Sequence, residues 1–507
     1  MFLATTALGE DKIAAAAQRF PWVAGLLIAA TALIGLLAQV HWGVNTDTSW
    51  NITLAEKVLA GQRPGVDFFE INPPLSYLLY LPAVLAARLA GVRAELMVDL
   101  LCFLGAGLSL WLSGEILRRA GLIDRASGAR LAVVAAIAVI LLPSGAFNER
   151  EHIALLASLP CLAALATLAS DRRVEPALSS LAGLGAGLAM SIKPHFALFF
   201  LPCLVYVAGR NGWRKAAFEI GAYVALAILA LYWIAAAIWA PAYFAFVAPI
   251  VRDIYIPDRK PLEALLADPS LFIWACLIAL LPLIARRRLA EPLLAIPALA
   301  SVGAMAAYVL QGKLWPYQAY PAIALAALAI GPIAVEKAAS PGPSRKIWLR
   351  LAAAQAVAGL LLLAGYWLAL RIDRTDLEKA IAAIAAHPTI LAISPDIETG
   401  HPLTRRVHGR WVGGAYGPWI TQLSQRALER HPGAKDAQKL EAYMRFDRER
   451  LVADILTNKP DVILVANEDW MAWARAHPDV EAALEEYDFT QRVDDTIVYA
   501  RAKASAR

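Results

Sequence analysis

Residues 41–93 read HWGVNTDTSWNITLAEKVLAGQRPGVDFFEINPPLSYLLYLPAVLAARLAGVR and directly follow the first long apolar segment of the chain. Asp47 stands in this stretch at the point where a membrane-spanning helix should leave the bilayer. Leu54, Val58 and Leu59 are apolar at helical spacing, against Glu56 and Lys57 on the polar face, which predicts a short amphipathic helix after the carboxylate. An ionisable group at a membrane boundary is costly to keep, so Asp47 is a candidate functional residue.

The composition indicates a polytopic membrane protein. Of the 507 residues, 59% are hydrophobic and 18% are charged, whereas a soluble protein carries about 25% charged residues. The net charge of +5 is interpreted as lysine and arginine of cytoplasmic loops, so no nucleic-acid partner is predicted. The four cysteines all fall within apolar segments, where they are expected to be small core residues outside any disulfide framework.

The sequence predicts eleven membrane spans. The positive-inside rule then favours a cytoplasmic N-terminus and an extracytoplasmic C-terminus, because all the basic loop clusters fall on one side if residues 74–91 are a partly buried helix of the first external loop. Lys12 and Arg19 precede the first span, as in a retained signal anchor. The predicted spans are residues 22–42, 96–117, 130–144, 153–169, 176–191, 194–209, 217–240, 270–285, 291–310, 319–335 and 347–370.

Two domains are expected: a transmembrane domain over residues 1–372, with its first external loop at 44–95, and an extracytoplasmic α/β domain over 373–507. In the second domain, apolar runs alternate with helical patterns. The expected strands are residues 389–394, 461–466 and 495–500, and the expected helices are 378–386 and 447–457. Trp411, Tyr416 and Trp419 could stack on sugar rings or pack in the core, and the sequence leaves both readings open.

The first external loop also carries a family resemblance. Asp47, a helix ending in Ala60-Gly61, then Asp67-Phe68 and Pro73-Pro74 resemble the corresponding loop of GT-C glycosyltransferases. These are multi-span α-helical enzymes with interfacial helices in that loop, and the nearest groups are bacterial relatives of protein O-mannosyltransferases and of lipid A aminoarabinose and galacturonic acid transferases. The resemblance implies that Asp47 is the catalytic base, although the second adjacent acid of many members is absent here.

Each acid of the loop has a second interpretation. Asp47 could instead cap the amphipathic helix. Asp67 and Glu70 could position an acceptor, hold a divalent cation or likewise serve local structure. A metal site that combines His152 with these acids is a further candidate, although no ligand spacing demands it.

Basic residues gather in the other loops of the predicted external face. Arg150, Lys193 and Lys313 are predicted to bind the phosphate of a lipid-linked donor, since such a phosphate lies at headgroup level and needs cations there. The alternatives are a surface loop with a local ion pair around Arg150 and snorkelling of the lysines at the interface. The predicted supporting residues are Glu151, His152, His195, Tyr317 and Gln318, of which Gln318 departs from the Tyr-His pair of the relatives.

The glycines at positions 183, 185 and 187 resemble a phosphate loop only superficially. They lie inside an apolar helix with no preceding strand, so close helix packing is predicted instead.

The resemblance implies a hexosyl- or pentosyltransferase that moves a sugar, with inversion, from a polyprenyl-phosphate donor to a lipid, polysaccharide or protein acceptor. It implies a bacterial inner-membrane enzyme of the cell envelope, with its active site and C-terminal domain on the periplasmic side. No cofactor is required beyond the candidate divalent cation. The alternative is a transporter or flippase of a lipid-linked saccharide. Transporters tend to place polar residues at mid-membrane and to have repeated halves, whereas no repeated halves are obvious here and the spans are largely free of charge.

Overall fold

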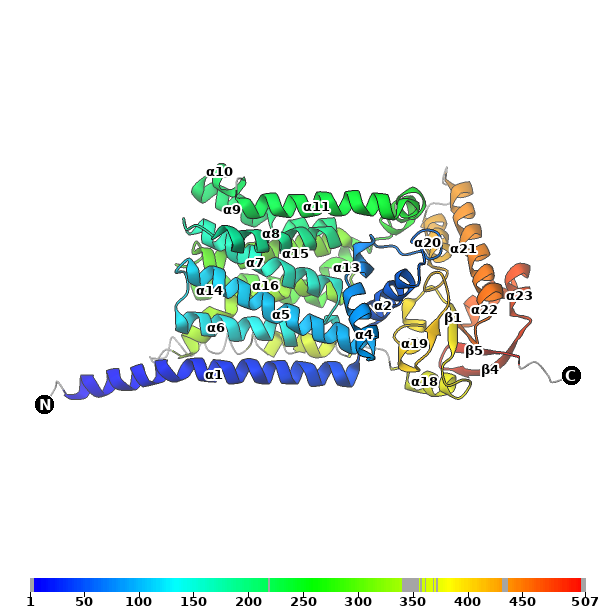
Figure 1. Cartoon of the computed structure of the whole chain (residues 1–507), viewed down its shortest axis with the longest axis horizontal. Coiled ribbons are helices and arrows are strands. Elements are labelled where there is room, and N and C mark those ends of the chain that lie inside the picture. The colour runs from blue at the N-terminus through cyan, green and yellow to red at the C-terminus, as the bar shows by residue number, and fades with distance from the viewer. Residues whose placement is uncertain are drawn as a thin grey trace. The chain divides into compact units, whose positions relative to one another are not determined.

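A computed structural model of the chain describes residues 4–217, 219–339, 355, 358–360, 362–367, 369–370, 373–430 and 436–502 (Figure 1). The chain forms two compact units. The first contains residues 1–43, 98–234 and 260–371, and the second contains residues 44–97, 235–259 and 372–507. The second unit is therefore assembled from three stretches that are far apart in the sequence.

The first unit is a bundle of long apolar helices that run side by side (Figure 1). In the described part of the chain, six helices are long and apolar enough to cross a membrane. They are α1 (Ala4–Trp42, apolar over Trp22–Trp42), α5 (Ala94–Arg119), α7 (Arg150–Ala169), α11 (Ile220–Trp239), α15 (Pro292–Gln311) and α16 (Pro316–Ala339). The prediction of a polytopic membrane protein is confirmed.

Shorter helices account for the other predicted spans up to residue 335. These are α6 (Arg125–Ala136) with the π-helix η1 (Ile137–Leu141), α8 (Pro176–Ile192), the 3-10 helix η3 (Pro194–Phe199) with α9 (Leu201–Asn211), and α14 (Pro269–Ala285). The short helices η2 (Ser144–Ala146), α10 (Trp213–Ala217) and α13 (Leu262–Leu266) lie in the connections. The last predicted span, residues 347–370, falls largely outside the described residues.

The glycine-rich run lies in α8, where it permits close approach of neighbouring helices. A Cβ atom on Gly183 would lie 2.1 Å from the carbonyl oxygen of Gly221 in α11, and one on Gly185 would lie 2.2 Å from that of Ala157 in α7. Both distances are far below van der Waals contact. The prediction of helix packing, rather than a phosphate loop, is confirmed.

The second unit is built around a five-stranded mixed sheet of order β2-β1-β3-β5-β4. Its strands are β1 (Thr389–Ile393), β2 (Arg410–Trp411), β3 (Val462–Val465), β4 (Tyr487–Val493) and β5 (Thr496–Arg501). β1 is parallel to β2 and β3, whereas β5 is antiparallel to both β3 and β4. The three expected strands are confirmed as β1, β3 and β5, and the small α/β fold is confirmed with them; β2 and β4 were not expected.

Side chains alternate between the two faces of this sheet. Leu391 and Ile393 of β1 face a core shared with α21 (Ala437–Asn458), α22 (Glu468–Arg475) and α23 (Pro478–Leu484). Ile390 and Ala392 face the opposite core, which is formed with α18 (Thr375–Ala382), α19 (Leu403–Arg406) and α2 (Thr46–Leu59). The amphipathic helix of the first loop thus covers one face of a sheet that lies more than 300 residues later in the sequence.

This packing buries more of α2 than the sequence predicted. Leu54 is fully buried as predicted, but Lys57, which was expected on the polar face, is buried as well. Burial lowers the pKa of the Lys57 ammonium group, and the negative charge of Asp454 opposes that shift. The prediction of a helix is confirmed. The prediction that its polar face is exposed is wrong at Lys57, because other parts of the unit enclose the helix.

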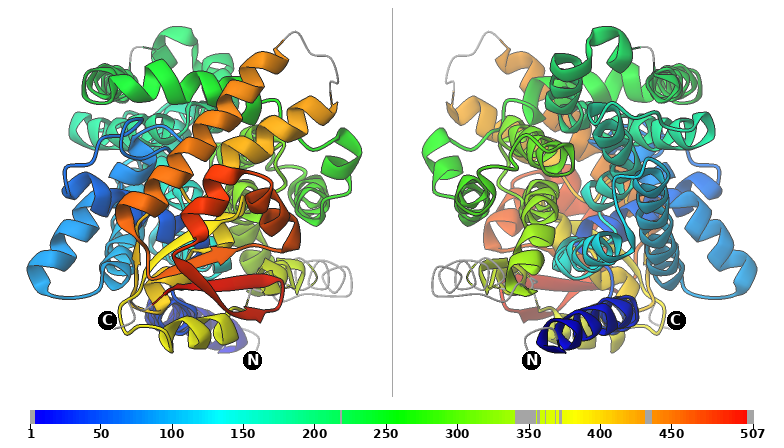
Figure 2. Two further views of the ribbon diagram at one scale, coloured as in Figure 1. Left: turned by 90° about the vertical axis from the view of Figure 1, so that its right-hand side faces the viewer. Right: turned by 90° about the vertical axis from the view of Figure 1, so that its left-hand side faces the viewer.

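The remaining parts of the second unit are helical. Residues 74–91 form α3 (Leu75–Leu78) and α4 (Leu81–Ala90), which are partly buried and too short to span a bilayer. Residues 243–255 form η4 (Tyr243–Val247), α12 (Ala248–Ile250) and η5 (Val251–Tyr255), which share a core with α20 (Trp419–Arg430) and α21. Helices α20 and α21 lie beside each other (Figure 2), and the 3-10 helix η6 (Ile397–Thr399) follows β1.

Candidate functional site

The predicted site residues fall into two groups, one in each unit. The first unit holds Arg150, Glu151, His152, Lys193, His195, Lys313, Tyr317 and Gln318, and the second holds Asp47, Asp67 and Glu70.

A buried polar cluster lies where α7 begins. Arg150 is only 2% exposed, and Glu149 and Glu151 beside it are also buried. Asn148, two residues before Arg150, has a left-handed backbone (φ 58°), and its side-chain amide donates a hydrogen bond of 2.6 Å to Asp99 of α5. Residues 150–152 are therefore part of a helix inside the protein, so the alternative of an exposed surface loop around Arg150 is wrong.

Lys193 is held at the end of α8 by a carboxylate of the same cluster. Its Nζ lies 2.5 Å from Oε1 of Glu151, which is fully buried. The ammonium group also donates to the Gln311 side chain at 3.5 Å and lies 5.9 Å from the centre of the Tyr317 ring. Because Lys193 itself is buried, its charge is directed into the protein, and the snorkelling alternative is wrong for this residue.

The connection between α15 and α16 supplies Lys313 and Gln318. Both side chains are buried, and the turn before them is made possible by left-handed backbone at Gly312 (φ 64°) and Leu314 (φ 63°). Oε1 of Gln318 is buried without a hydrogen-bond partner among the described residues. A buried polar atom in that state is available to a ligand or water.

The two histidines of this group differ in their contacts. His152 accepts a hydrogen bond from the Asn148 backbone N–H at 3.1 Å through Nδ1, and its Nε2 donates to the Val139 carbonyl oxygen at 2.8 Å. Both ring nitrogens are therefore used to join the start of α7 to η1. Nε2 of His195 is buried and has no hydrogen-bond partner in the described part of the chain.

In the second unit, Asp47 lies in the first turn of α2. The N-cap of that helix is Asn45, whose side chain accepts a hydrogen bond of 2.8 Å from the Thr48 backbone N–H. The alternative reading of Asp47 as the cap is therefore wrong, although its charge still interacts favourably with the helix dipole. Asp47 is half-buried.

The other two acids of the first loop have clear structural partners. Glu70 is buried and accepts hydrogen bonds from Nε1 of Trp50 at 2.6 Å and from the backbone and side chain of Asn72 at 2.9 and 2.5 Å. Asp67 is exposed and pairs with Arg63, whose backbone N–H is the main cause of the lowered pKa of Asp67.

Further acids lie near Asp47, and they come from the segment after β1. Burial and the negative charge of Asp396 raise the pKa of Glu398, and the Asp47 carboxylate contributes to the same shift, whereas Arg374 opposes it. The pKa of Tyr416 is raised by burial and by Glu70, Asp47 and other acidic groups. Sequence reasoning missed Asp396 and Glu398, although an Asp-x-Glu pair directly after a parallel strand is where ligand-binding residues of α/β folds collect.

Arg405 of α19 links the segment that follows β1 to α2 through hydrogen bonds. Its guanidinium donates to the Ser49 carbonyl oxygen, to the Thr53 hydroxyl and to both oxygens of Glu56, at distances from 2.7 to 3.1 Å. Nearby, Nδ1 of His401 lies 3.0 Å from the Ser49 hydroxyl. These contacts fix the first two turns of the helix that carries Asp47.

The aromatic candidates for sugar stacking are mostly core residues. Trp411 is 4% and Trp419 is 1% exposed, which favours the packing alternative for both. Tyr416 is half-buried and meets Trp50 edge to face at 6.0 Å. In the described residues, no group of three His, Cys, Asp or Glu side chains is arranged to hold a metal ion.

The fold as a whole resembles that of solved membrane proteins. No protein-family model and no curated protein matches the chain. A crystal structure of ArnT from Cupriavidus metallidurans bound to undecaprenyl phosphate matches with a TM-score of 0.59 at 15% identity, over 96% of this chain and 98% of that one. The apo structure of the same protein gives 0.57 at 15% identity, over 94% and 97%.

The helical bundle and the mixed sheet define the chain as a polytopic membrane protein of the ArnT-like fold. The resemblance to the GT-C group that the sequence predicted is thereby confirmed at the level of the fold. The protein compared in both matches is ArnT, and the likeness extends over nearly its full length.

Proposed function

We propose that this chain is a membrane glycosyltransferase that transfers a sugar from a polyprenyl-phosphate donor to an acceptor at the extracytoplasmic face of a bacterial inner membrane. The observation that supports this most is the match of both units, over 96% of the chain, to an ArnT structure that holds undecaprenyl phosphate. The donor class follows from that lipid.

The cations of the first unit suit the phosphate of such a donor. Arg150, Lys193 and Lys313 are all buried, in a bundle whose length and composition suit a bilayer. Charge develops on the phosphate as the bond to the sugar breaks, and cations that are already ordered stabilise it without further reorganisation. The ion pair between Lys193 and Glu151 keeps the lysine oriented before donor binds.

Asp47 is proposed as the general base that removes the proton from the acceptor hydroxyl. The lipid phosphate is already a good leaving group, so one carboxylate on the opposite face of the sugar is enough, and the anomeric configuration is inverted. The contacts of Arg405 to α2 support this role, because they orient the first turns of the helix.

The test is transfer of radiolabelled sugar from a polyprenyl-phosphate donor pool in membranes, with Asp47→Asn compared with the native chain at equal expression. We expect transfer to fall by about 10²- to 10⁴-fold, the usual effect of losing a general base, while binding of undecaprenyl phosphate is retained. Asp488→Asn is the matched control, because it makes the same change at an exposed position of β4 in the same unit.

Normal transfer by Asp47→Asn would exclude Asp47 as the base and would leave Asp67 and Glu70 as the acids to test. If the native chain shows no transfer but moves the carrier lipid between leaflets, the protein is a transporter and the proposal is wrong.

A further inference from the structure

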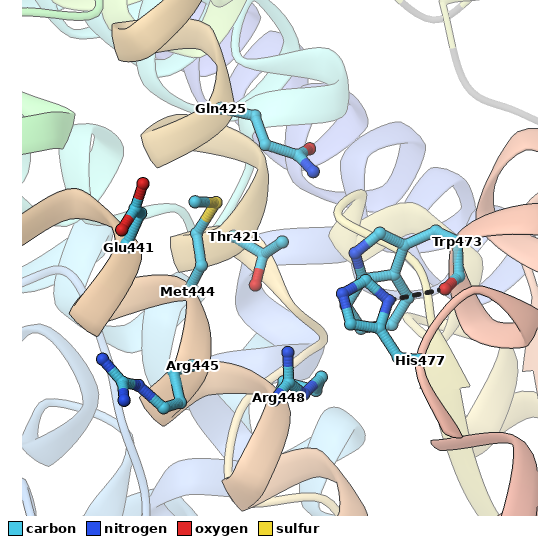
Figure 3. Close-up of a pocket in the computed structure, with 8 residues that line it drawn as sticks. All are labelled: Thr421, Gln425, Glu441, Met444, Arg445, Arg448, Trp473 and His477. Carbon is cyan, nitrogen blue, oxygen red and sulfur yellow. Dashed lines mark hydrogen bonds between the residues drawn. The ribbon is translucent and has the colours of Figure 1, made fainter. Parts of the chain in front are cut away.

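A cavity of about 360 Å³ opens between α20, α21 and the end of α22, within the second unit. None of its lining residues belongs to the groups described above. Small-molecule sites have volumes of roughly 300–1,000 Å³, so this cavity has room for one or two sugar rings. Figure 3 shows the rings of Trp473 and His477 on one side of it and side chains of α21 on the other.

The two arginine side chains of the cavity have few hydrogen-bond or ion-pair partners among the described residues. Arg445 has no ion pair or hydrogen bond to any described residue. Arg448, one turn further along α21, donates through Nε to Asp479 at 2.8 Å, which fixes its guanidinium and leaves its two terminal nitrogens without described protein partners. A guanidinium group in this state suits the oxygens of a carboxylate or phosphate, which arginine binds through paired hydrogen bonds.

The opposite wall is a rigid aromatic surface. The Trp473 ring lies 5.2 Å from the Trp470 ring and 4.8 Å from the His477 ring. Nδ1 of His477 donates to the Trp473 carbonyl oxygen at 2.8 Å, as the dashed line in Figure 3 shows. Trp473 and His477 therefore give this wall an aromatic lining, and aromatic side chains are the groups against which the C–H side of a pyranose ring packs.

One neutral and one acidic side chain complete the lining. Gln425 of α20 and Glu441 of α21 both line the cavity, and neither has a side-chain partner among the described residues. An amide and a carboxylate hydrogen-bond readily to sugar hydroxyls, because the amide both donates and accepts and the carboxylate accepts.

We propose that this cavity is a binding site for an anionic saccharide, with the sugar ring on Trp473 and its carboxylate or phosphate on Arg445 and Arg448. The site is separate from Asp47 and does not depend on the transferase proposal. Binding at the cavity is measured without catalytic turnover, so a failure to detect binding would leave the transferase proposal unaffected.

The experiment measures binding of small probes to the full-length protein by saturation-transfer NMR, because the 15 tryptophans of the chain complicate fluorescence. A polyoxyethylene detergent is used, since it has neither a sugar nor a phosphate headgroup. The probes are glucuronate, glucose 6-phosphate, glucose and inorganic phosphate. We expect both charged sugars to bind at least about tenfold more tightly than glucose or inorganic phosphate.

Arg445→Gln should weaken binding of the charged sugars by about tenfold or more and leave glucose unchanged. Arg475→Gln is the matched control: Arg475 is also exposed and lacks a described partner, but it does not line the cavity. Trp473→Leu should weaken all three sugars, and if that variant does not fold, the two arginine variants still decide.

The relative affinity of the two charged sugars identifies the anionic group that the site prefers. The proposal is overturned if glucose binds as tightly as the charged sugars, if inorganic phosphate alone binds as tightly as glucose 6-phosphate, if Arg475→Gln weakens binding as much as Arg445→Gln, or if no probe binds.

Discussion

Arg405 gives the most direct test of how the second unit is held together. The Arg405→Met variant keeps an unbranched apolar side chain similar to the aliphatic part of arginine and removes the guanidinium that contacts Ser49, Thr53 and Glu56 of α2. The Arg405 side chain is 11% exposed, whereas that of Glu56 is 37% exposed, so solvent screens part of the ion pair.

The magnitude follows from these contacts. A hydrogen bond to a charged group contributes about 1.5–3 kcal/mol. After discounting for the exposed carboxylate, we expect the free energy of unfolding to fall by about 2 kcal/mol in all. For a cooperative unit of roughly 150–250 residues, this loss lowers the Tm by about 4–8 °C.

The assay is thermal unfolding of the purified full-length chain in detergent, followed by protease resistance of the second unit. Arg410→Met serves as the control, since Arg410 is an exposed arginine of β2 whose side chain makes no hydrogen bond or ion pair with the described residues. Arg405→Lys should be intermediate, because lysine keeps the charge but cannot bind Glu56 in a bidentate manner. Equal Tm values for Arg405→Met and Arg410→Met would refute the reasoning.

Three other predictions concern packing, a buried ion pair and pH. Gly185→Ala places a Cβ atom 2.2 Å from a carbonyl oxygen of α7 and should lower the Tm or the folded yield, whereas Gly107→Ala, which has open space around it, should not. Lys193→Met leaves the fully buried Glu151 carboxylate unpaired and should cost about 3–5 kcal/mol of unfolding free energy; thermal unfolding should show partial recovery when Glu151→Gln is added. The pKa of Glu398 is raised above 4.5, so the stability that its proton contributes is present below that pH and is lost as the pH rises through the folded-state pKa. The Glu398→Gln variant should therefore have the same Tm as the native chain below pH 4.5, and a Tm that increasingly exceeds that of the native chain as the pH rises toward about 7. A Tm difference that does not change with pH would contradict this.

The bundle could be predicted from the sequence because its signal is local. A span needs about 20 consecutive apolar residues, and each predicted span up to residue 335 coincides with described helices. The glycine run of α8 was also interpretable, since an apolar helix with small residues at short intervals has few other uses. The strands β1 and β3 were predicted for the same reason: each is a short, continuous apolar run.

The misses are residues whose environment is set by distant segments. β2 has two residues and β4 is mostly exposed, so neither carries a hydrophobic pattern, and each is defined by pairing with another strand. Lys57 appeared to be on a solvent-exposed face because the residues that enclose α2 lie far along the chain. Glu151 was expected to support Arg150, but its ion pair is with Lys193 of another helix.

The sequence by itself therefore determined that the protein is a polytopic membrane protein, the positions of its apolar helices and the small α/β fold, because hydropathy and periodicity act over a few turns. Only the tertiary structure decided that α2 packs on a sheet from the C-terminal part of the chain and that Glu398 lies near Asp47. Such contacts join residues separated by more than 300 positions, and no local pattern specifies which distant surface will bury a given side chain.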